Sequence, residues 1–458
     1  MKACVLGVAV LFAGVAVADE IDEPISGEAI VELVPGTDIA AFNAQYGTTT
    51  IDSIPGRPIY LLQLPTTMTD DQFELLVAGD PAVVEEEINF SGSDPGGDTR
   101  SFYGSTTSAA YQAQTQGSSL RLNEAQQLSM GSGIVVAILD TGVDSTHPVL
   151  ASSMLPGWNF VTNSTDTSDV ARGTDSNANG LPDELVGHGT FIAGIVHLVA
   201  PNSQILPVTV LDSDGRATSF RVAKGIYYAI DHQADVINLS MGSSASTMVM
   251  SDAIEEARQH WITVVAAGGN YGNSAPVPEQ FPAAMESNRT IAVAATDWTG
   301  VRAPFSSYGD YMTISAPGVD VIGTFPGGTF EIAEGTSFST AWTTGAVALL
   351  KTIGWDTSPS KIAENIENSA INIDPLNPGF NGLIGSGELD IRAAMDLRVL
   401  NPGCAADLND DDLLDAADFT AWLAAYNAGD FAADQNKDKQ LTPADFTAWL
   451  ANFGAGCP

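Results

Sequence analysis

The stretch EGTSFSTAWTTGAVALL, residues 334–350, decides which kind of fold the chain can adopt. It opens with Gly335, Thr336 and Ser337, which predict a tight turn with a hydroxyl group near its end. The residues that follow are small or apolar, a composition typical of a buried helix. A serine at the start of such a helix is either an N-cap or a nucleophile near the positive end of the helix dipole. The stretch alone leaves both alternatives open.

Apolar runs elsewhere predict the strands that such a helix would cover. These runs lie at residues 134–139, 205–211, 236–239, 262–267 and 290–295. Each run is continuous, as expected of parallel strands covered on both faces. Helical segments lie between them, near residues 190–198, 219–232 and 251–259. Strands that alternate with helices predict an α/β unit with a doubly wound parallel sheet, which spans residues 120–400.

The N-terminal part has a different pattern. Within residues 19–90, the segment from residue 29 onward has the order strand, helix, strand, strand, helix, strand. That order predicts a small α+β domain of the split-βαβ type. Residues 91–119 are rich in Ser, Gly, Thr, Gln and Asp, which predicts a flexible linker that is easily cleaved.

Composition limits the possible partners and the compartment. The chain has 56 acidic and 17 basic residues, a formal net charge of −39, which argues against binding to nucleic acid phosphates. Residues 1–18 combine Lys2, an apolar run and a small-residue end, which predicts a secretory signal peptide and a secreted, extracellular protein. No later run is long enough to span a membrane. Beyond the signal, Cys404 and Cys457 remain, and an oxidising compartment would allow them to pair.

Three residues with complementary chemistry lie at the ends of elements in the α/β unit. Asp140 ends the first buried strand, His188 stands where a glycine-flanked turn enters a helix, and Ser337 opens the helix described above. A carboxylate can orient an imidazole, and the imidazole can take the serine proton and return it to a leaving amine. Strand ends and helix starts face one crevice in an open α/β sheet, so the three can converge there.

Asn270 is a fourth candidate, because it follows the buried strand VVAA and two glycines. Its carboxamide could donate a hydrogen bond to an oxyanion, alongside the backbone N–H of Ser337. Each of these residues also has a structural alternative. Asp140 could cap a turn, His188 could be a satisfied structural histidine, and Asn270 could close a loop.

The blocks AILDTGVD (137–144), GHGTFIAG (187–194), AAGGN (266–270) and GTSFS (335–339) resemble, in this order, the active-site blocks of the subtilisin-like serine proteases. The resemblance spans roughly residues 120–400. It implies Asp140 as orienting acid, His188 as general base, Ser337 as nucleophile and Asn270 as oxyanion donor. It also implies that the substrate cleft is lined by Ser240, Met241, Gly242, Ala267, Gly268 and Gly269.

The same resemblance extends to the N-terminal segment, and the chain departs from the family pattern in the nucleophile block. Residues 19–90 are similar to the propeptide of this family, which assists folding and inhibits the enzyme until it is removed. The nucleophile block departs from the family pattern at Ala341, where proline is usual, and at Trp342, where histidine is frequent. Alanine is a strong helix former, so the helix is expected to persist.

Residues 175–184, DSNANGLPDE, resemble the first part of a calcium loop. Asp175, Asn177 and Asn179 alternate and Gly180 supplies the turn, but Val186 occupies the twelfth position, where a carboxylate is needed. An ordinary Asn/Asp/Gly turn is the alternative.

The segment 401–458 repeats the sequence ADFTAWLA at 417–424 and 444–451. Oxygen-bearing side chains precede each copy with the spacing of a twelve-residue calcium loop, at positions 1, 3, 5, 9 and 12. The predicted Ca²⁺ ligands are Asp407, Asn409, Asp411, Asp415 and Asp418 in the first loop, and Asp434, Asn436, Asp438, Thr442 and Asp445 in the second. The pair resembles a dockerin module, which implies a docking partner. It departs from that pattern at Asp412 and Lys439, where glycine is usual.

These features predict a secreted serine endopeptidase that acts on proteins or peptides and is activated by propeptide removal. The rival hypothesis is an inert binding or scaffold protein that is docked through its C-terminal repeats. The presence of all four candidate catalytic residues favours the enzyme.

Overall fold

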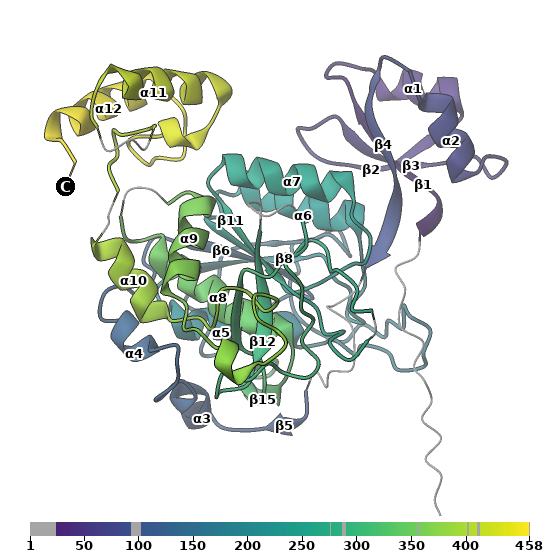
Figure 1. Cartoon of the computed structure of the whole chain (residues 1–458). Coiled ribbons are helices and arrows are strands. Elements are labelled where there is room, and N and C mark those ends of the chain that lie inside the picture. The colour runs from purple at the N-terminus through teal and green to yellow at the C-terminus, as the bar shows by residue number, and fades with distance from the viewer. Residues whose placement is uncertain are drawn as a thin grey trace, which may run out of the picture.

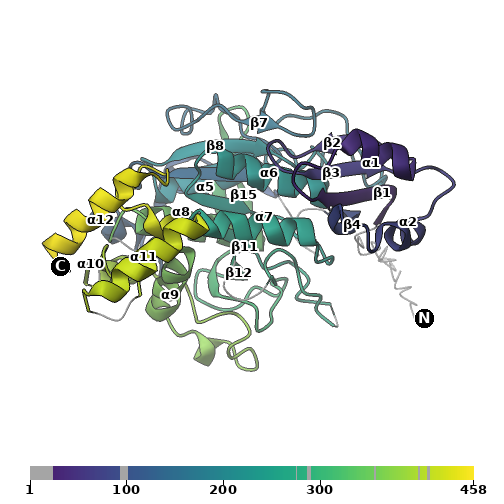
Figure 2. The same cartoon turned by 90° about the horizontal axis from the view of Figure 1, so that it is seen from above.

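The computed structural model describes residues 24–92, 102–274, 276–285, 290–354, 357–400, 403–409 and 413–457. Within these residues the chain forms an N-terminal unit, a large central unit and a C-terminal pair of helices (Figure 1). The predicted signal peptide, residues 1–18, lies outside this description. Figure 2 shows the N-terminal unit and the C-terminal helices at opposite ends of the central unit.

The central unit is built on a seven-stranded sheet in the order β13-β12-β11-β10-β6-β8-β7. Its strands are β6 (Val135–Asp140), β7 (Trp158–Asn159), β8 (Gln204–Thr209), β10 (Val236–Leu239), β11 (Thr263–Ala267), β12 (Thr290–Thr296) and β13 (Ile314–Pro317). All neighbouring strands are parallel. The predicted α/β fold with a doubly wound parallel sheet is therefore confirmed.

Helices cover both faces of this sheet. One face is covered by α6 (Ser219–Asp231) and α7 (Met248–Gln259), and the other by α5 (His188–Val199) and α8 (Thr336–Leu350). The shorter helices α4 (Leu122–Ala125), α9 (Pro359–Ser369) and α10 (Ile391–Leu400) pack on the side of α8. Neighbouring strand residues alternate between the two cores, with Leu139 in the α6–α7 core and Ile138 in the α5–α8 core. This alternation explains why the strand sequences are apolar without interruption.

Every residue of α8 is buried. Gly345 permits this, because a Cβ added there would lie 2.5 Å from Cβ of Val199 on α5. The helix continues unbroken through Ala341 and Trp342, the positions that depart from the family pattern. The Trp342 ring packs edge-on against Trp298, with ring centroids 6.0 Å apart.

The N-terminal unit has the predicted order of elements. It consists of β1 (Pro24–Leu33), α1 (Ile39–Tyr46), β2 (Thr49–Ser53), β3 (Ile59–Gln63), α2 (Asp70–Val77) and β4 (Val83–Gly92). Its antiparallel strands lie in the order β2-β3-β1-β4, and it has a core of its own around Phe42, Tyr46 and Phe73. The end of β4 also pairs with β9 (Ala217–Thr218) of the central unit.

The prediction of a flexible linker at residues 91–119 is wrong for residues 102–119. Here β5 (Gly104–Ser105) pairs with β15 (Thr329–Ala333), which in turn pairs with β14 (Val321–Phe325). The next helix, α3 (Ser108–Ala113), buries Tyr111, whose hydroxyl donates to Gly194 O at 2.7 Å. Residues 93–101 lie outside the described part.

The central unit also contains a short helix, η1 (Asp374–Leu376).

The C-terminal repeats form α11 (Ala416–Ala428) and α12 (Pro443–Ala455), with the short helix η2 (Phe431–Ala433) between them. The two tryptophans play equivalent parts. Trp422 Nε1 donates to Ala433 O at 3.1 Å, and Trp449 Nε1 donates to Ala406 O at 3.2 Å. A disulfide joins Cys404 to Cys457, which confirms the predicted pairing.

Two lysines attach the C-terminal helices to the central unit. Lys439 Nζ lies 2.9 Å from Asp235 Oδ1 and donates to Gln233 O at 2.7 Å. Lys437 Nζ donates to Gly354 O at 3.4 Å. Across the described parts of the chain, no helix has the length and apolar character needed to cross a membrane.

The disulfide leads to a prediction about this small C-terminal unit. Its core of buried residues consists of two alanines and two tryptophans, so the crosslink should supply a large share of its stability. Replacing both Cys404 and Cys457 by serine should destabilise it locally by about 2–4 kcal/mol. Hydrogen exchange of α11 and α12 should then become faster, while exchange in α8 stays slow. Unchanged protection of α11 and α12 would contradict the prediction.

Candidate active site

Asp140 and His188 form a buried pair at one end of the sheet. His188 Nδ1 lies 2.9 Å from Oδ1 and 3.0 Å from Oδ2 of Asp140. Both side chains are almost completely buried, and the backbone N–H of Thr141 donates to Asp140 Oδ1 at 2.7 Å. The carboxylate therefore holds the Nδ1 edge of the imidazole.

Gly189 allows these two residues to meet. A Cβ added at this position would lie 2.1 Å from Gly142 O and 3.0 Å from Asp140 Cβ. Any side chain would push the start of α5 away from the end of β6. The glycine after the histidine is thus required by packing.

The start of α5 is held by residues distant in sequence. Gly187 is the N-cap residue and has no side chain to bind the first-turn N–H groups. The carboxylate of Asp169 and the hydroxyl of Thr141 bind them instead. Asp169 was not predicted from the sequence, since it lies in a polar stretch without a recognisable motif.

Ser337 is the second residue of α8 and lies against the end of β10. Its Oγ donates to Ser240 O at 3.5 Å, and the Ser240 hydroxyl donates to Ser337 O at 3.1 Å. The ring of Phe338, which follows Ser337, lies 5.7 Å from the His188 ring between centroids. The structure thus brings the starts of α5 and α8 together at the same edge of the sheet.

Asn270 lies beside the start of α8 in a fixed orientation. Its Oδ1 accepts hydrogen bonds from Thr336 N and Thr336 Oγ1, both at 2.9 Å. A backbone N–H can only donate, so the carboxamide oxygen must face Thr336, and Nδ2 must point the other way. The first-turn N–H groups of α8, including that of Ser337, have no acceptor within the helix. Asn270 Nδ2 and the Ser337 amide are therefore donors available for an anion.

The predicted substrate-lining segments are the continuations of two neighbouring strands. Ser240–Gly242 follows β10 and Ala267–Gly269 covers the end of β11, and these strands pair in parallel. Gln280 lies between them and is buried. A Cβ on Gly242 would lie 2.7 Å from Gln280 Oε1, and one on Gly269 would lie 2.5 Å from Gln280 Cγ. Gln280 was not predicted from the sequence, because it is isolated among loop residues.

The contacts of residues 175–184 are those of a turn. Asp175 Oδ2 accepts from Gly180 N at 3.1 Å, and Asn177 and Asn179 both donate to Glu184. Asp183 caps the N–H groups of residues 172–174. These contacts close a turn, and calcium binding by residues 175–184 stays a prediction.

Equivalent predicted ligands of the two C-terminal loops make equivalent hydrogen bonds. Asp415 and Thr442, at position nine, are the N-caps of α11 and α12. Asp418 Oδ1 accepts from Leu408 N at 3.1 Å, and Asp445 Oδ1 accepts from Gln435 N at 3.2 Å. Asp407 and Asn409 belong to the first loop, and Asp411 lies outside the described residues.

The second loop is complete and permits a test of its fit to a cation. Asp434 accepts from the backbone N–H groups of Asp438 and Lys439, and Asn436 and Asp438 bond each other. Burial raises the pKa of Asp434, and the charges of Asp445 and Asp438 raise it further. Carboxylates that raise one another's pKa carry charge that a bound Ca²⁺ ion would neutralise. At position six, Lys439 adopts a left-handed φ of 61° in place of the usual glycine.

Comparison with known proteins identifies relatives of the central unit. The family model described as "Subtilase family" matches residues 131–402. Thermitase of Thermoactinomyces vulgaris is 38% identical over 247 residues, covering 54% of this chain and 84% of thermitase. Subtilisin BL of Lederbergia lenta is 36% identical over 274 residues, covering 58% of this chain and 91% of that protein.

Among solved structures, fervidolysin from Fervidobacterium pennivorans, a keratinolytic enzyme related to subtilisin, matches with a TM-score of 0.66 and 23% identity. The match covers 83% of this chain and 62% of the fervidolysin chain. At that identity the likeness concerns the fold.

The close approach at Gly189 generates a prediction. Gly189→Ala would force its Cβ against Gly142 O and separate His188 from Asp140. We expect the catalytic efficiency for a peptide substrate to fall by about 10²-fold or more. Gly454→Ala, at a helical glycine of α12 with no atom near its added Cβ, is the matched control and should leave activity unchanged. Full activity of Gly189→Ala would show that the Asp140–His188 contact is not needed.

Proposed function

Because the chain belongs to the subtilase family of serine endopeptidases, we propose that Asp140, His188 and Ser337 carry out its peptide-bond hydrolysis. The observation that carries the proposal is the buried contact of His188 Nδ1 with the Asp140 carboxylate. A carboxylate in that position fixes the tautomer in which Nε2 is the base.

Each step is assigned to one group of the chain. His188 takes the proton of Ser337 as its Oγ attacks the carbonyl carbon of the substrate, and Asp140 stabilises the imidazolium that forms. Asn270 Nδ2 and the Ser337 amide donate to the developing oxyanion. His188 then returns the proton to the leaving amine. Water enters in its place and releases the acyl group by the same sequence.

The substrate lies, in this proposal, between the segments Ser240–Gly242 and Ala267–Gly269. Their glycines leave a space into which Gln280 extends. A polar carboxamide at that place gives the cleft a hydrogen-bonding group for the substrate side chain.

The rival hypothesis of an inert scaffold requires the site to be assembled but unreactive. Asn270 is held with its acceptor oxygen on Thr336 at the start of α8, so that its donor Nδ2 points the other way, and this orientation supports the enzyme. A fluorophosphonate probe separates the two hypotheses, since it labels a serine only when that serine is activated.

Substitution of the proposed nucleophile provides the direct test. Ser337→Ala should abolish peptide hydrolysis without changing the thermal unfolding midpoint, and the precursor should still carry residues 19–92. Asn270→Ala should lower kcat by about 10²–10³-fold, the magnitude known for the equivalent donor in subtilisin. Ser153→Ala, at a buried serine bonded to His197, is the control. Hydrolysis or self-cleavage by purified Ser337→Ala would overturn the assignment.

The N-terminal unit is, we infer, an inhibitory propeptide. Glu87 accepts from Met248 N and Val249 N at the start of α7, and Asn89 Oδ1 accepts from Phe220 N at the start of α6. The end of β4 reaches the substrate-lining segment, where Gly92 and Met241 line one cavity. The described part of the N-terminal unit therefore ends at the cleft with Gly92, and we propose that self-cleavage occurs within residues 93–101.

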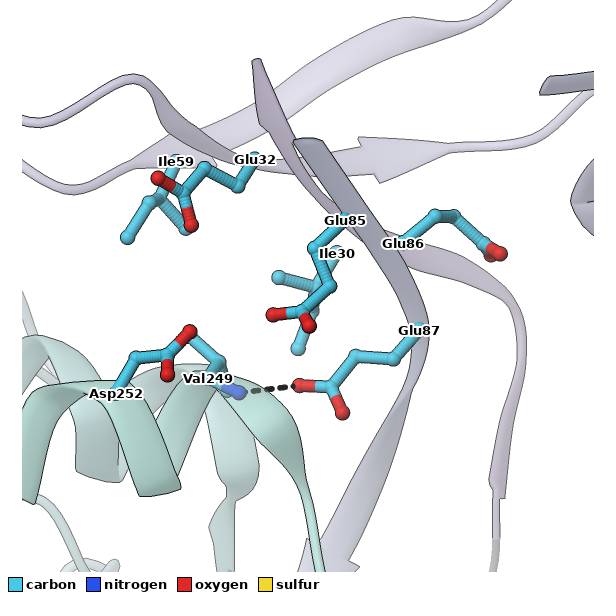
Figure 3. A pocket seen from close by; sticks show the side chains of 8 residues that line it. All are labelled: Ile30, Glu32, Ile59, Glu85, Glu86, Glu87, Val249 and Asp252. Carbon is cyan, nitrogen blue, oxygen red and sulfur yellow. Dashed lines mark hydrogen bonds between the residues drawn. The ribbon is translucent and has the colours of Figure 1, made fainter. Parts of the chain in front are cut away.

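The same interface also brings like charges together. Oxygens of Glu32 and Glu85 of the N-terminal unit and Asp252 of α7 lie within 4.8 Å of one another. Figure 3 shows Glu32, Glu85 and Glu87 directed toward α7, whereas Glu86 points away. Arg57 offsets part of this charge, since it pairs with Asp231 of α6 and Glu256 of α7.

These carboxyl groups make docking depend on pH. Burial, followed by the nearby carboxylates, raises the pKa of Glu85 to about 7. Burial also raises the pKa of Glu32 and of Glu87. A pKa raised in the docked state means that protonation favours docking. Docking is therefore strongest below the ordinary glutamate pKa and weakens as pH rises through about 7.

The expected result is a propeptide that inhibits less well at higher pH. For the separated fragment 19–92 acting on the mature enzyme, the inhibition constant should rise by at least about tenfold between about pH 5.5 and about pH 8. Glu85→Gln should flatten this dependence, and Asp71→Asn, on the exposed side of α2, should leave it unchanged. A pH-independent inhibition constant for the unaltered fragment would refute the role of these carboxyls.

We further propose that the C-terminal loops hold Ca²⁺, which would neutralise their carboxylates and complete the loop structure. Both copies of ADFTAWLA expose the same residues. These are Phe419 and Leu423 on α11, and Phe446 and Leu450 on α12. Such a duplicated apolar surface supports a protein docking partner. The disulfide and the signal-like residues 1–18 support secretion.

Position six of the second loop yields a prediction about calcium. Lys439→Gly should bind Ca²⁺ more tightly, because glycine adopts the left-handed conformation without the strain of about 1–2 kcal/mol. Asp434→Ala should weaken binding at least about tenfold by removing a ligand. Calorimetry on the full chain in a Ser337→Ala background measures both. Binding isotherms that are identical in all three proteins would exclude the second loop as a site.

A further inference from the structure

Asp169 is a buried acid for which the proposed reaction has no assigned use. It lies between β7 and α5, and it is 1% exposed. Its Oδ1 accepts from Gly187 N at 2.9 Å and from Thr141 Oγ1 at 3.2 Å. Its Oδ2 accepts from Thr190 N at 3.1 Å and from Thr190 Oγ1 at 2.7 Å. One carboxylate thus receives four hydrogen bonds.

These hydrogen bonds surround His188. Gly187 precedes His188 and Thr190 lies two residues after it, so Asp169 binds the backbone of α5 both before and after His188 in the chain. Thr141 continues the network, because its hydroxyl also accepts from Gly189 N at 3.1 Å. Its backbone N–H donates to Asp140 Oδ1. Asp169 and Asp140 are therefore joined through Thr141.

The charge of Asp169 is costly at this place. Burial raises its pKa to about 6 despite the hydrogen bonds, and the neighbouring charge of Asp140 contributes to the shift. Of the ionisable groups around it, Asp140 lies across the Thr141 link, and His188 lies on the turn that it binds. A neutral side chain would avoid the desolvation cost of an ionised one. A buried charge retained beside a reactive group indicates a functional role.

We infer that Asp169 is a positioning residue for His188. It fixes the first turn of α5 so that the imidazole stays against Asp140. Its negative charge also favours the imidazolium that forms when Ser337 loses its proton. The inference rests on the proposed role of His188 as general base.

The test is Asp169→Asn in the mature enzyme, with active sites counted by fluorophosphonate labelling. An amide cannot accept from all four donors. We expect kcat per active site to fall about 10–100-fold. KM should change little, because Asp169 does not contact the substrate-lining segments. The acid limb of the kcat/KM profile should move to lower pH by about half a unit, since a lost negative charge disfavours the imidazolium.

Asp166→Asn is the matched control, because Asp166 is an exposed acid of the same segment and should leave both readouts unchanged. Thr190→Val removes one donor to Asp169, together with the acceptor of Asp144 N, and should give a smaller fall in kcat per active site, without a change in KM. If Asp169→Asn does not fold, Thr190→Val provides the test. An unchanged kcat per active site in Thr190→Val then overturns the inference.

A purely structural Asp169 would give another result. The thermal midpoint and the number of labelled sites would fall in Asp169→Asn, while kcat per labelled site and the acid limb stayed in place. That result overturns the inference. Absence of labelling in the unaltered enzyme would instead contradict the proposed function, so the two failures are distinguishable.

Discussion

The burial of α8 along its whole length is the constraint on which the reactive groups depend. All residues of Thr336–Leu350 are buried, and Gly345 permits close packing on Val199 of α5. A helix packed along its full length has one position relative to the sheet. Its first turn therefore lies where β10 and β11 end, and Ser337 is placed by the core of the protein. A side chain placed by core packing keeps its geometry better than one on a loop.

Much of this arrangement follows from local sequence, and that part could be predicted. The parallel strands are short apolar runs, and Asp140, His188 and Asn270 lie at the ends of elements that such runs define. The order of the N-terminal elements was equally readable, because Thr69 forms a capping box at the start of α2. In each case the residues that decide the structure are neighbours in the chain.

Other features depend on partners distant in sequence and could not be predicted. Residues 102–119 have the composition of a linker, yet Tyr111 is buried because Gly194 and Phe330 provide its contacts. Asp169 lies in a polar stretch of sequence. Its contacts with the start of α5 are visible only in the folded structure. Gln280 acquires its position from two glycines on separate strands. Sequence composition cannot predict these contacts, since they arise from the packing of the whole unit.

Lys439 shows that a departure from a motif can reflect a second requirement. A glycine at this position would suit the loop, since the residue adopts a left-handed φ. Lysine bears that strain and reaches Asp235, whose other carboxylate oxygen accepts from Val135 N at the start of β6. The loop is thus locally less stable but is attached to Asp235, which in turn bonds the start of the strand that carries Asp140.

The interface between the N-terminal unit and the central unit combines contacts that favour docking with contacts that oppose it. Glu87 binds the free N–H groups at the start of α7, and Arg57 pairs with two acids of the central unit, so both contacts favour docking. Glu32 and Glu85 face Asp252 and oppose it. As the proposed inhibitor, this unit must later leave, so it cannot be held by favourable contacts alone. In a chain with a net charge of −39, like charges at this interface offer a direct way to limit its affinity, because their repulsion disappears once the two units separate.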